Sequence, residues 1–196
     1  DAFEKDFTTN GIGLLTDAAS CVVTEERNGT YELTLTYPEK GHMAKYITKD
    51  AIIKAKANDE DEPQLFRIYK AGKAVGSNTT WNAEHISYEM NGNPVEKFKV
   101  SGVNAQRAMQ ELLDAAALPH SFTASSDITT TNSTSIDGVV SVRNALGGTT
   151  GSILDVWGGE YHFNNFRIEL LKARGANNGV TIEYGKNLIS AKQEEN

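Results

Sequence analysis

The sequence GIGLLTDAASCVVTEERNGTYELTLTYP occupies residues 11–38 and contains the clearest structural signal in the chain. Asn28 and Gly29 lie between two alternating runs, Cys21–Arg27 and Thr30–Tyr37. Asn-Gly is the strongest two-residue signal for a β-hairpin, because both positions tolerate a positive φ. In the second run apolar side chains alternate with polar ones, which predicts a strand with one buried face made of Tyr31, Leu33, Leu35 and Tyr37.

Three further segments of the first half have the composition of strands. They are Ala51–Ala57, Gln64–Lys70 and Thr79–Met90. The acidic run Asp59–Glu62 separates the first two and is typical of a solvated loop, because it lacks the spaced oxygen ligands of a calcium loop. Together with the hairpin these segments predict five short strands, arranged as a barrel or sandwich.

The apolar period changes near residue 99. Between Asn104 and Ala117 the apolar residues recur at three- and four-residue steps, which predicts an amphipathic helix. Asn104 is suited to cap its start, and Pro119 helps to stop it. The predicted buried stripe consists of Ala105, Ala108, Met109, Leu112, Leu113 and Ala116.

The rest of the chain alternates short helices with strands. Residues 123–135 are rich in serine and threonine, and either an extended arm or a loose loop fits them. One helical turn is predicted at Ser141–Leu146 and a second, capped by Thr150, runs through Trp157. A hairpin turns at Asn164-Asn165, and a last strand is predicted at Val180–Tyr184.

These patterns predict an α+β fold that is predominantly β. A β-barrel-like module is expected at residues 1–98, and an α+β module with a return strand at residues 99–196. No internal repeat or flexible linker separates the two. The pattern is typical of a folded chain with a modest core, since 39% of its 196 residues are hydrophobic.

The charge balance excludes several classes of partner. Nineteen basic and 26 acidic residues give a net charge of −7. Specific nucleic-acid binding requires a basic face that displaces phosphate counterions, and an anionic membrane attracts basic segments, so neither partner is expected. The sequence contains no signal peptide and no apolar run long enough to cross a membrane.

A single cysteine, Cys21, excludes a disulfide within the chain. Its place in the first hairpin strand predicts a buried, inert thiol. The sequence begins at Asp1 without a methionine, so we expect a piece of a longer protein.

No arrangement of side chains predicts an active site. Glu84 and His85 are adjacent in a predicted strand and therefore point to opposite faces. Ser87 and Ser152 lack the motif of an activated serine, and the glycine-rich loop 147–152 lacks the lysine of a phosphate-binding loop. Four separated histidines and one cysteine match no zinc spacing: His42, His85, His120 and His162. We therefore expect no catalytic, cofactor-binding or metal-binding residues and no cofactor.

Several segments, taken in order, resemble the N-terminal hub region of phage and prophage tail-tip proteins. This family is often described as prophage endopeptidase tail or tail-associated lysin. The segments are Thr24–Gly29 with Tyr31–Leu33, Gln64–Tyr69, Ala83–Tyr88, Gly158–Glu160 with Asn165-Phe166, Arg174-Gly175 and Tyr184–Leu188.

The resemblance implies a structural protein of the baseplate hub. Such hubs are homotrimers with a central channel, in which each subunit contributes two similar β-barrel domains and matches the hexameric ring of distal tail protein. The implied partners are that ring and the tail tube or tape-measure protein. The implied location is the virion tail tip, after synthesis in the host cytoplasm. An acidic channel wall would not retain passing DNA.

Two departures limit what this resemblance implies. A full hub continues beyond the YGKNL segment, whereas this sequence stops at Asn196, so we expect the second barrel to be missing. The lysin activity of the family belongs to a C-terminal module, and no such module follows here. Enzymatic activity is therefore not expected, and an incomplete subunit can lose part of its trimer interface.

Two alternatives remain open at this point. The first is a carbohydrate- or receptor-binding module of the tail tip, which would use exposed aromatic platforms from Trp81, Trp157 and Tyr161. The second is a cell-wall hydrolase, which would require carboxylates from Glu25 with Glu26 or from Asp155 with Glu160.

Overall fold

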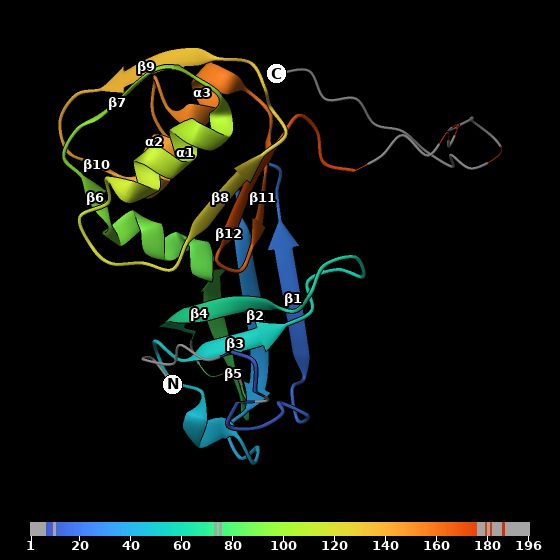
Figure 1. Ribbon diagram of the computed structural model, residues 1–196. Coiled ribbons are helices and arrows are strands. Elements are labelled where there is room, and N and C mark those ends of the chain that lie inside the picture. Colours follow the sequence, from blue (N-terminus) through green and yellow to red (C-terminus); the bar gives the residue numbers. More distant parts are fainter. Residues whose placement is uncertain are drawn as a thin grey trace, which may run out of the picture.

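Two modules lie one above the other in the protein (Figure 1). The computed structural model describes residues 7–9, 11–72, 74, 76–175, 179, 181 and 186. The predicted strand at residues 180–184 therefore falls largely outside the described residues. We call the sheet β1–β5 the N-terminal module, and the elements from β6 to β12 with α1–α3 the C-terminal module.

The N-terminal module is a five-stranded antiparallel sheet in the order β1-β2-β5-β4-β3. β3 and β4 cross the direction of β1, β2 and β5 steeply, which gives the sheet the shape of a half-barrel (Figure 1). A register shift between Ile68 and Lys70 interrupts the β4–β5 ladder. The strands are β1 Ser20–Glu25, β2 Tyr31–Pro38, β3 Ile52–Ala55, β4 Gln64–Ala71 and β5 Asn78–His85, with a 3₁₀ helix η1 at Ala44–Tyr46.

The predicted β1–β2 hairpin is confirmed, but its turn is wider than Asn-Gly alone suggests. Within that pair only Asn28 has a positive φ, of 55°. The Gly29 N–H donates to the Glu26 carbonyl at 3.1 Å, and the Glu26 N–H donates to the Thr30 carbonyl at 2.7 Å. The loop therefore leaves the Asn28 side chain at its tip, where it is free to contact another part of the chain.

The two strands of this hairpin differ in burial. All four apolar side chains predicted for β2 are buried, as expected from their period of two. The prediction of a buried Cys21 is wrong: the residue is exposed. The reason is topological, because β1 is an edge strand that pairs with β2 alone and is exposed along most of its length.

The strand predicted at Thr79–Met90 is only partly correct. β5 ends at His85, and a 3₁₀ helix, η2, follows at Ile86–Gly92. The His85 side chain accepts a hydrogen bond from the Ser87 N–H and so caps this helix. A side-chain cap that competes with the strand ladder is not visible in an alternating pattern.

The C-terminal module combines three small sheets with three helices. The sheets are β11-β12-β8, β7-β9 and β10-β6. Its strands are β6 Pro94–Val95, β7 Phe98–Val103, β8 Thr123–Ser126, β9 Asn132–Ile136, β10 Val140–Ser141, β11 Glu160–Asn164 and β12 Arg167–Leu171, and its helices are α1 Ala105–Asp114, α2 Val142–Gly147 and α3 Ile153–Trp157.

Helix α1 confirms the amphipathic prediction. The Asn104 side chain accepts from the Arg107 N–H, and the predicted stripe is buried except for the half-buried Ala116. α3 begins later than predicted, because Ser152 rather than Thr150 supplies its cap. The serine- and threonine-rich segment is not a loose loop: it forms β8, which pairs in parallel with β12, and β9, which pairs with β7.

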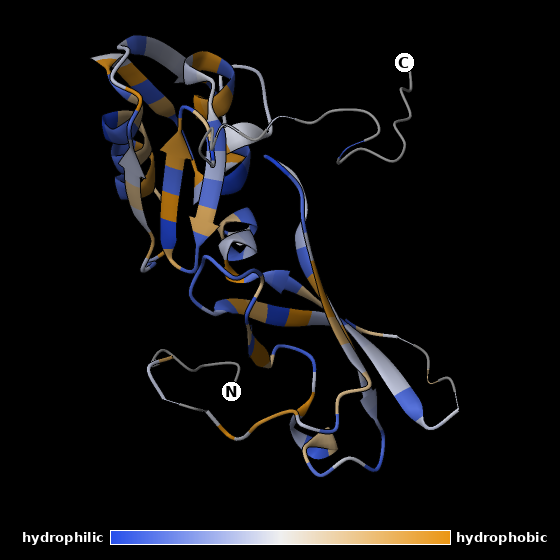
Figure 2. Cartoon of the chain, turned by 90° about the vertical axis from the view of Figure 1, so that its right-hand side faces the viewer, coloured by the Kyte–Doolittle hydropathy of each residue, from blue (hydrophilic) through white to orange (hydrophobic). Residues whose placement is uncertain are grey.

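One continuous cluster of buried side chains runs from the first sheet into the helices. The apolar and polar bands along the strands are visible in Figure 2. The fold class is α+β and predominantly β, as predicted. The module boundary near residue 98 stays a prediction, and β6, which precedes it, pairs with β10 of the C-terminal module.

Candidate functional site: a polar seam between the modules

The tip of the β1–β2 hairpin reaches the start of β11 in the other module. The Asn28 amide donates to the Gly159 carbonyl at 3.0 Å and accepts from the Tyr161 N–H at 2.7 Å. Beside it, Arg27 forms an ion pair with Glu160 at 2.8 Å. A side chain at the hairpin tip thus satisfies backbone groups of the C-terminal module. We call this contact and the ones described next the seam.

Gly159 allows the backbone before β11 to pass close to β12. Its φ is +99°, and an added Cβ would lie 2.5 Å from the Leu171 carbonyl oxygen and 2.8 Å from the Ile128 side chain. Only glycine fits this position. At this close approach to β12 the Gly159 carbonyl accepts the hydrogen bond from Asn28.

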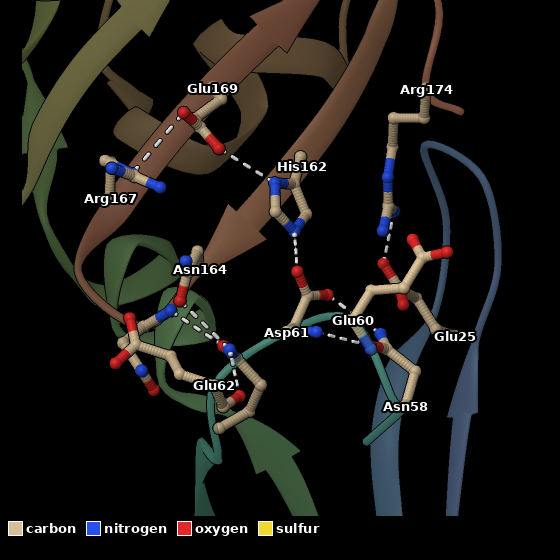
Figure 3. Close-up of polar contacts among 12 residues, drawn as sticks. Glu25, Asn58, Glu60, Asp61, Glu62, His162, Asn164, Arg167, Glu169 and Arg174 are labelled. Carbon is tan, nitrogen blue, oxygen red and sulfur yellow. Dashed lines mark hydrogen bonds and ion pairs between the residues drawn. The ribbon is translucent and has the colours of Figure 1, made fainter. Parts of the chain in front are cut away.

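Arg174 links the chain beyond β12 to both modules. Its guanidinium pairs with Glu25 of β1 (Figure 3). Its backbone N–H donates to Glu160 at 2.8 Å. That backbone hydrogen bond, helped by Arg27, holds the pKa of the Glu160 carboxyl below its usual value. The seam therefore alternates acidic and basic groups, Glu25, Arg174, Glu160 and Arg27.

His162 of β11 lies between two carboxylates. Its Nε2 is 3.1 Å from Asp61 of the N-terminal module, and its Nδ1 is 2.8 Å from Glu169 of β12 (Figure 3). All three side chains are less than one-fifth exposed, at 14%, 16% and 19%. The two carboxylates thus face the two ring nitrogens, one from each module.

Asp61 belongs to the acidic run that the sequence places in a solvated loop, and for this residue the prediction is wrong. Burial alone would raise the pKa of its carboxyl, but the hydrogen bond from Asn58 and the neighbouring His162 together lower it. Asp59, two residues earlier, is fully exposed and matches the prediction. The loop is solvated on one side and bound to the seam on the other.

Gln64, at the start of β4, is fully buried and is the most connected side chain of the seam. Its amide nitrogen donates to Asn164 at 3.0 Å, and its amide oxygen accepts from the Asn165 N–H at 2.8 Å. Asn165 returns a contact, since its side-chain oxygen accepts from the Leu65 N–H at 2.9 Å. The β11–β12 turn is thus hydrogen-bonded to the start of β4 through amide side chains.

His85 supports Gln64 from inside the N-terminal module. Its Nε2 lies 3.1 Å from the Gln64 amide oxygen, and its ring stacks on Tyr31 at 4.4 Å between centroids. Because Nδ1 accepts from the Ser87 N–H, the ring proton sits on Nε2 and is donated to Gln64. Burial, and after it the charges of Arg143 and His162, lowers the pKa of His85 to about 3.

Arg143 of α2 contacts the same serine hydroxyl as His85, that of Ser87. Its guanidinium lies over the rings of Tyr88 at 4.5 Å and Phe163 at 4.2 Å, and it donates to the Ser87 hydroxyl at 2.8 Å. Burial lowers the pKa of this guanidinium. Aromatic faces stabilise a cation in place of a carboxylate here.

These groups do not form a catalytic arrangement. The Ser87 hydroxyl lies 3.0 Å from His85 Nδ1, but both residues are fully buried, so no substrate reaches them. Ser152 serves as the cap of α3. Among the described residues, no cluster of histidine, cysteine and carboxylate groups could hold a metal ion.

The carboxylates required by a hydrolase have structural partners. Glu25 and Glu160 are paired with arginines in the seam. The Asp155 carboxylate accepts from the Gly151 N–H at 2.8 Å, and Glu26 is exposed in the hairpin loop. The structure does not place either proposed pair as two free acids across a cleft.

Two of the three aromatic platforms are part of the core. Trp157 is buried and donates to the Val103 carbonyl at 3.3 Å, and the buried Tyr161 donates to the Leu146 carbonyl at 2.9 Å. Trp81 is half-buried on β5. Of the remaining histidines, His42 pairs with Asp17 at 2.6 Å and His120 lies 3.0 Å from the Leu113 carbonyl.

The seam unites segments that are far apart in the sequence. Four of the segments quoted for the family resemblance contribute to it: Thr24–Gly29, Gln64–Tyr69, Gly158–Glu160 with Asn165, and Arg174. Sequence reasoning did not identify it as a site, because none of these segments contains local chemistry. Their shared property appears only in the fold.

Substitutions of Asn28 distinguish the contribution of its side-chain hydrogen bonds from that of its positive φ. Asn28→Gly keeps the positive φ but removes both hydrogen bonds to the C-terminal module, and should lower the free energy of unfolding by about 1 kcal/mol at this exposed site. Asn28→Ala should cost about 1–2 kcal/mol more, because alanine also strains the left-handed backbone. Urea unfolding measures both values. Equal stability of Asn28→Gly and the wild type would contradict the role of the side chain.

Burial of His85 should make stability depend on pH. The pKa falls from 6.5 to about 3 on folding, so between these values the unfolded chain binds more protons. The free energy of unfolding should therefore fall as the pH drops below 6.5, by up to about 1.4 kcal/mol per pH unit. In urea unfolding from pH 4 to 7.5, His85→Gln should flatten this slope and the exposed control His120→Gln should keep it. If the free energy of unfolding of His85→Gln depended on pH as steeply as that of the wild type, the pH dependence would not come from His85.

Comparisons with known proteins identify a fold but no family. No family profile matches the chain, and no curated protein matches it. The fold is similar to that in the crystal structure of prophage tail protein gp18 from Listeria monocytogenes EGD-e, with a TM-score of 0.58 and 10% sequence identity. The similarity covers 80% of this chain and 45% of that protein, so the chain spans less than half of its length.

Proposed function

We propose that this chain is a structural component of a phage or prophage tail, and specifically the N-terminal part of a tail-tip hub. The observation that carries the proposal is the fold shared with a prophage tail protein over 80% of the chain. The ordered segments of the family resemblance point the same way independently. Since the shared fold alone does not establish a role, the seam and the charge of the chain supply the physical argument.

The seam suits a protein whose task is assembly. It joins the two modules through reciprocal hydrogen bonds and ion pairs instead of a flexible linker. A subunit of a closed ring must present its contacting surfaces at a fixed angle, because a rotation that does not close gives open filaments. A rigid junction between modules meets that requirement.

In the proposed role the complete protein forms a homotrimer, docks onto the distal tail ring and closes the tail tube near the tape-measure protein. The net charge of −7 supports this role, because an acidic surface does not retain DNA that passes through a channel. No helix in the described part of the chain is long and apolar enough to cross a membrane.

The alternatives receive less support from the geometry. A receptor-binding module built on Trp157 and Tyr161 would have to expose side chains that the core holds. In each carboxylate pair that a hydrolase would use, one member, Glu25 or Glu160, is paired with an arginine. We therefore propose no enzymatic activity for this chain, and any lysin activity would belong to another module of the complete protein.

Light scattering of the chain mixed with the distal tail protein of its own phage tests the proposal. The expected result is a complex of defined mass with three copies of the chain on a ring of six. The matched control is a distal tail ring from an unrelated phage, which should leave the chain unbound. A chain extended past Asn196 that also ignores its own ring would overturn the proposal, and lysis of cell walls by the chain would do the same.

A further inference from the structure

The pair Asn28-Gly29 is chemically reactive as well as turn-forming. In an Asn-Gly pair the backbone nitrogen of the glycine can attack the side-chain amide carbon of the asparagine, because glycine has no Cβ to hinder the approach. An N–C bond forms, the amide nitrogen leaves as ammonia with the proton of the glycine N–H, and a succinimide ring results. Water then opens the ring at either carbonyl and gives aspartate or isoaspartate. This deamidation needs no enzyme and no reactant other than water.

Both reacting groups are restrained in the closed seam. The Asn28 amide is held at both ends, since its nitrogen donates to the Gly159 carbonyl at 3.0 Å and its oxygen accepts from the Tyr161 N–H at 2.7 Å. Ring formation makes the amide carbon tetrahedral and expels this nitrogen, so the two hydrogen bonds oppose the reaction. The attacking nitrogen is engaged as well, because the Gly29 N–H donates to the Glu26 carbonyl at 3.1 Å. Asn28 is nevertheless exposed, so water reaches it.

We propose that Asn28 is a site of spontaneous deamidation that the closed seam protects, and that its conversion during an opening of the seam prevents the modules from closing again. A local opening releases protected groups for a fraction of time that its free energy sets. The product at residue 28 carries a carboxylate, which only accepts hydrogen bonds. The hydrogen bond to the Gly159 carbonyl is therefore lost.

The surroundings of residue 28 make this conversion one-way. With aspartate at this position a carboxylate oxygen meets the Gly159 carbonyl oxygen, and two acceptors without a donor between them are unfavourable. The new negative charge also lies near Glu160, whose partner Arg27 then has two acids to neutralise. In isoaspartate the main chain gains a methylene, which alters the hairpin tip itself. Deamidation therefore records, within one molecule, that the seam has been open.

A second Asn-Gly pair provides an internal control. The sequence contains four such pairs, and the structure describes two of them, at Asn28 and Asn91. Asn91 is exposed in the last turn of η2 and takes no part in the seam. Its deamidation depends on the local backbone and on global unfolding, whereas that of Asn28 depends on the seam as well. The inference rests on the contacts of Asn28 and not on the tail function.

Peptide mapping by mass spectrometry tests the protection. The full chain is incubated at neutral pH with and without denaturing urea, and conversion to aspartate and isoaspartate is followed at residues 28 and 91. Asn28 should deamidate at least about tenfold more slowly in the folded chain than in urea. In Arg174→Ala, which removes the ion pair with Glu25 across the seam, Asn28 should deamidate several-fold faster and Asn91 at an unchanged rate. Glu25→Gln removes the same ion pair from the other side and should act alike.

Three outcomes of this experiment would refute the protection. The first is a rate for Asn28 in the folded chain that equals its rate in urea. The second is an unchanged rate for Asn28 in both seam variants, which would mean that the hairpin alone restrains it. The third is acceleration of Asn28 and Asn91 by the same factor, which would mean that only global unfolding exposes Asn28.

The variant Asn28→Asp, which reproduces one product of the reaction, tests whether the conversion is one-way. The Leu65 and Asn165 N–H groups lie in the seam but do not contact residue 28. In this variant they should exchange with solvent several-fold faster than in the wild type, while the amides of β2 keep their protection. Unchanged exchange of both groups would show that the seam closes over aspartate, and would overturn the proposal.

Discussion

The structure depends on the reciprocal hydrogen bonding of amide side chains with the backbone across the seam. Asn28 of the N-terminal module binds the backbone on both sides of Glu160, and Gln64 and Asn165 each accept a backbone N–H from the opposite module. Backbone groups that are covered without a partner are costly, so these bonds are lost only together with the packing around them. Two modules joined in this way behave as one body.

The charged groups of the seam serve a different purpose. Buried ion pairs often contribute little net stability, whereas removal of one member leaves an uncompensated charge. The His162 ring between Asp61 and Glu169, and Arg174 between Glu25 and Glu160, therefore restrict which arrangements of the modules are tolerated. These polar partners meet only when the hairpin tip, the β3–β4 loop and β11 lie in their observed positions.

The secondary structure could be predicted from the sequence where the pattern that specifies it is local. The β1–β2 hairpin, the cap of α1 and the buried stripe of α1 follow from residues that are close in sequence. The seam could not be predicted in that way, because its partners are as far apart as Glu25 and Arg174, a separation of 149 residues. The exposure of Cys21 and the burial of Asp61 were missed for the same reason: both follow from which elements meet in the fold.

Backbone hydrogen exchange measured by NMR tests most directly whether the seam holds the modules as one body. Three backbone N–H groups donate to side chains of the opposite module across the seam, those of Leu65, Tyr161 and Asn165. If the modules move together, these groups should exchange as slowly as the amides of the buried strand β2. Exchange of these three groups at the rate of exposed loops, while β2 stays protected, would show that the modules separate without unfolding and would contradict the account.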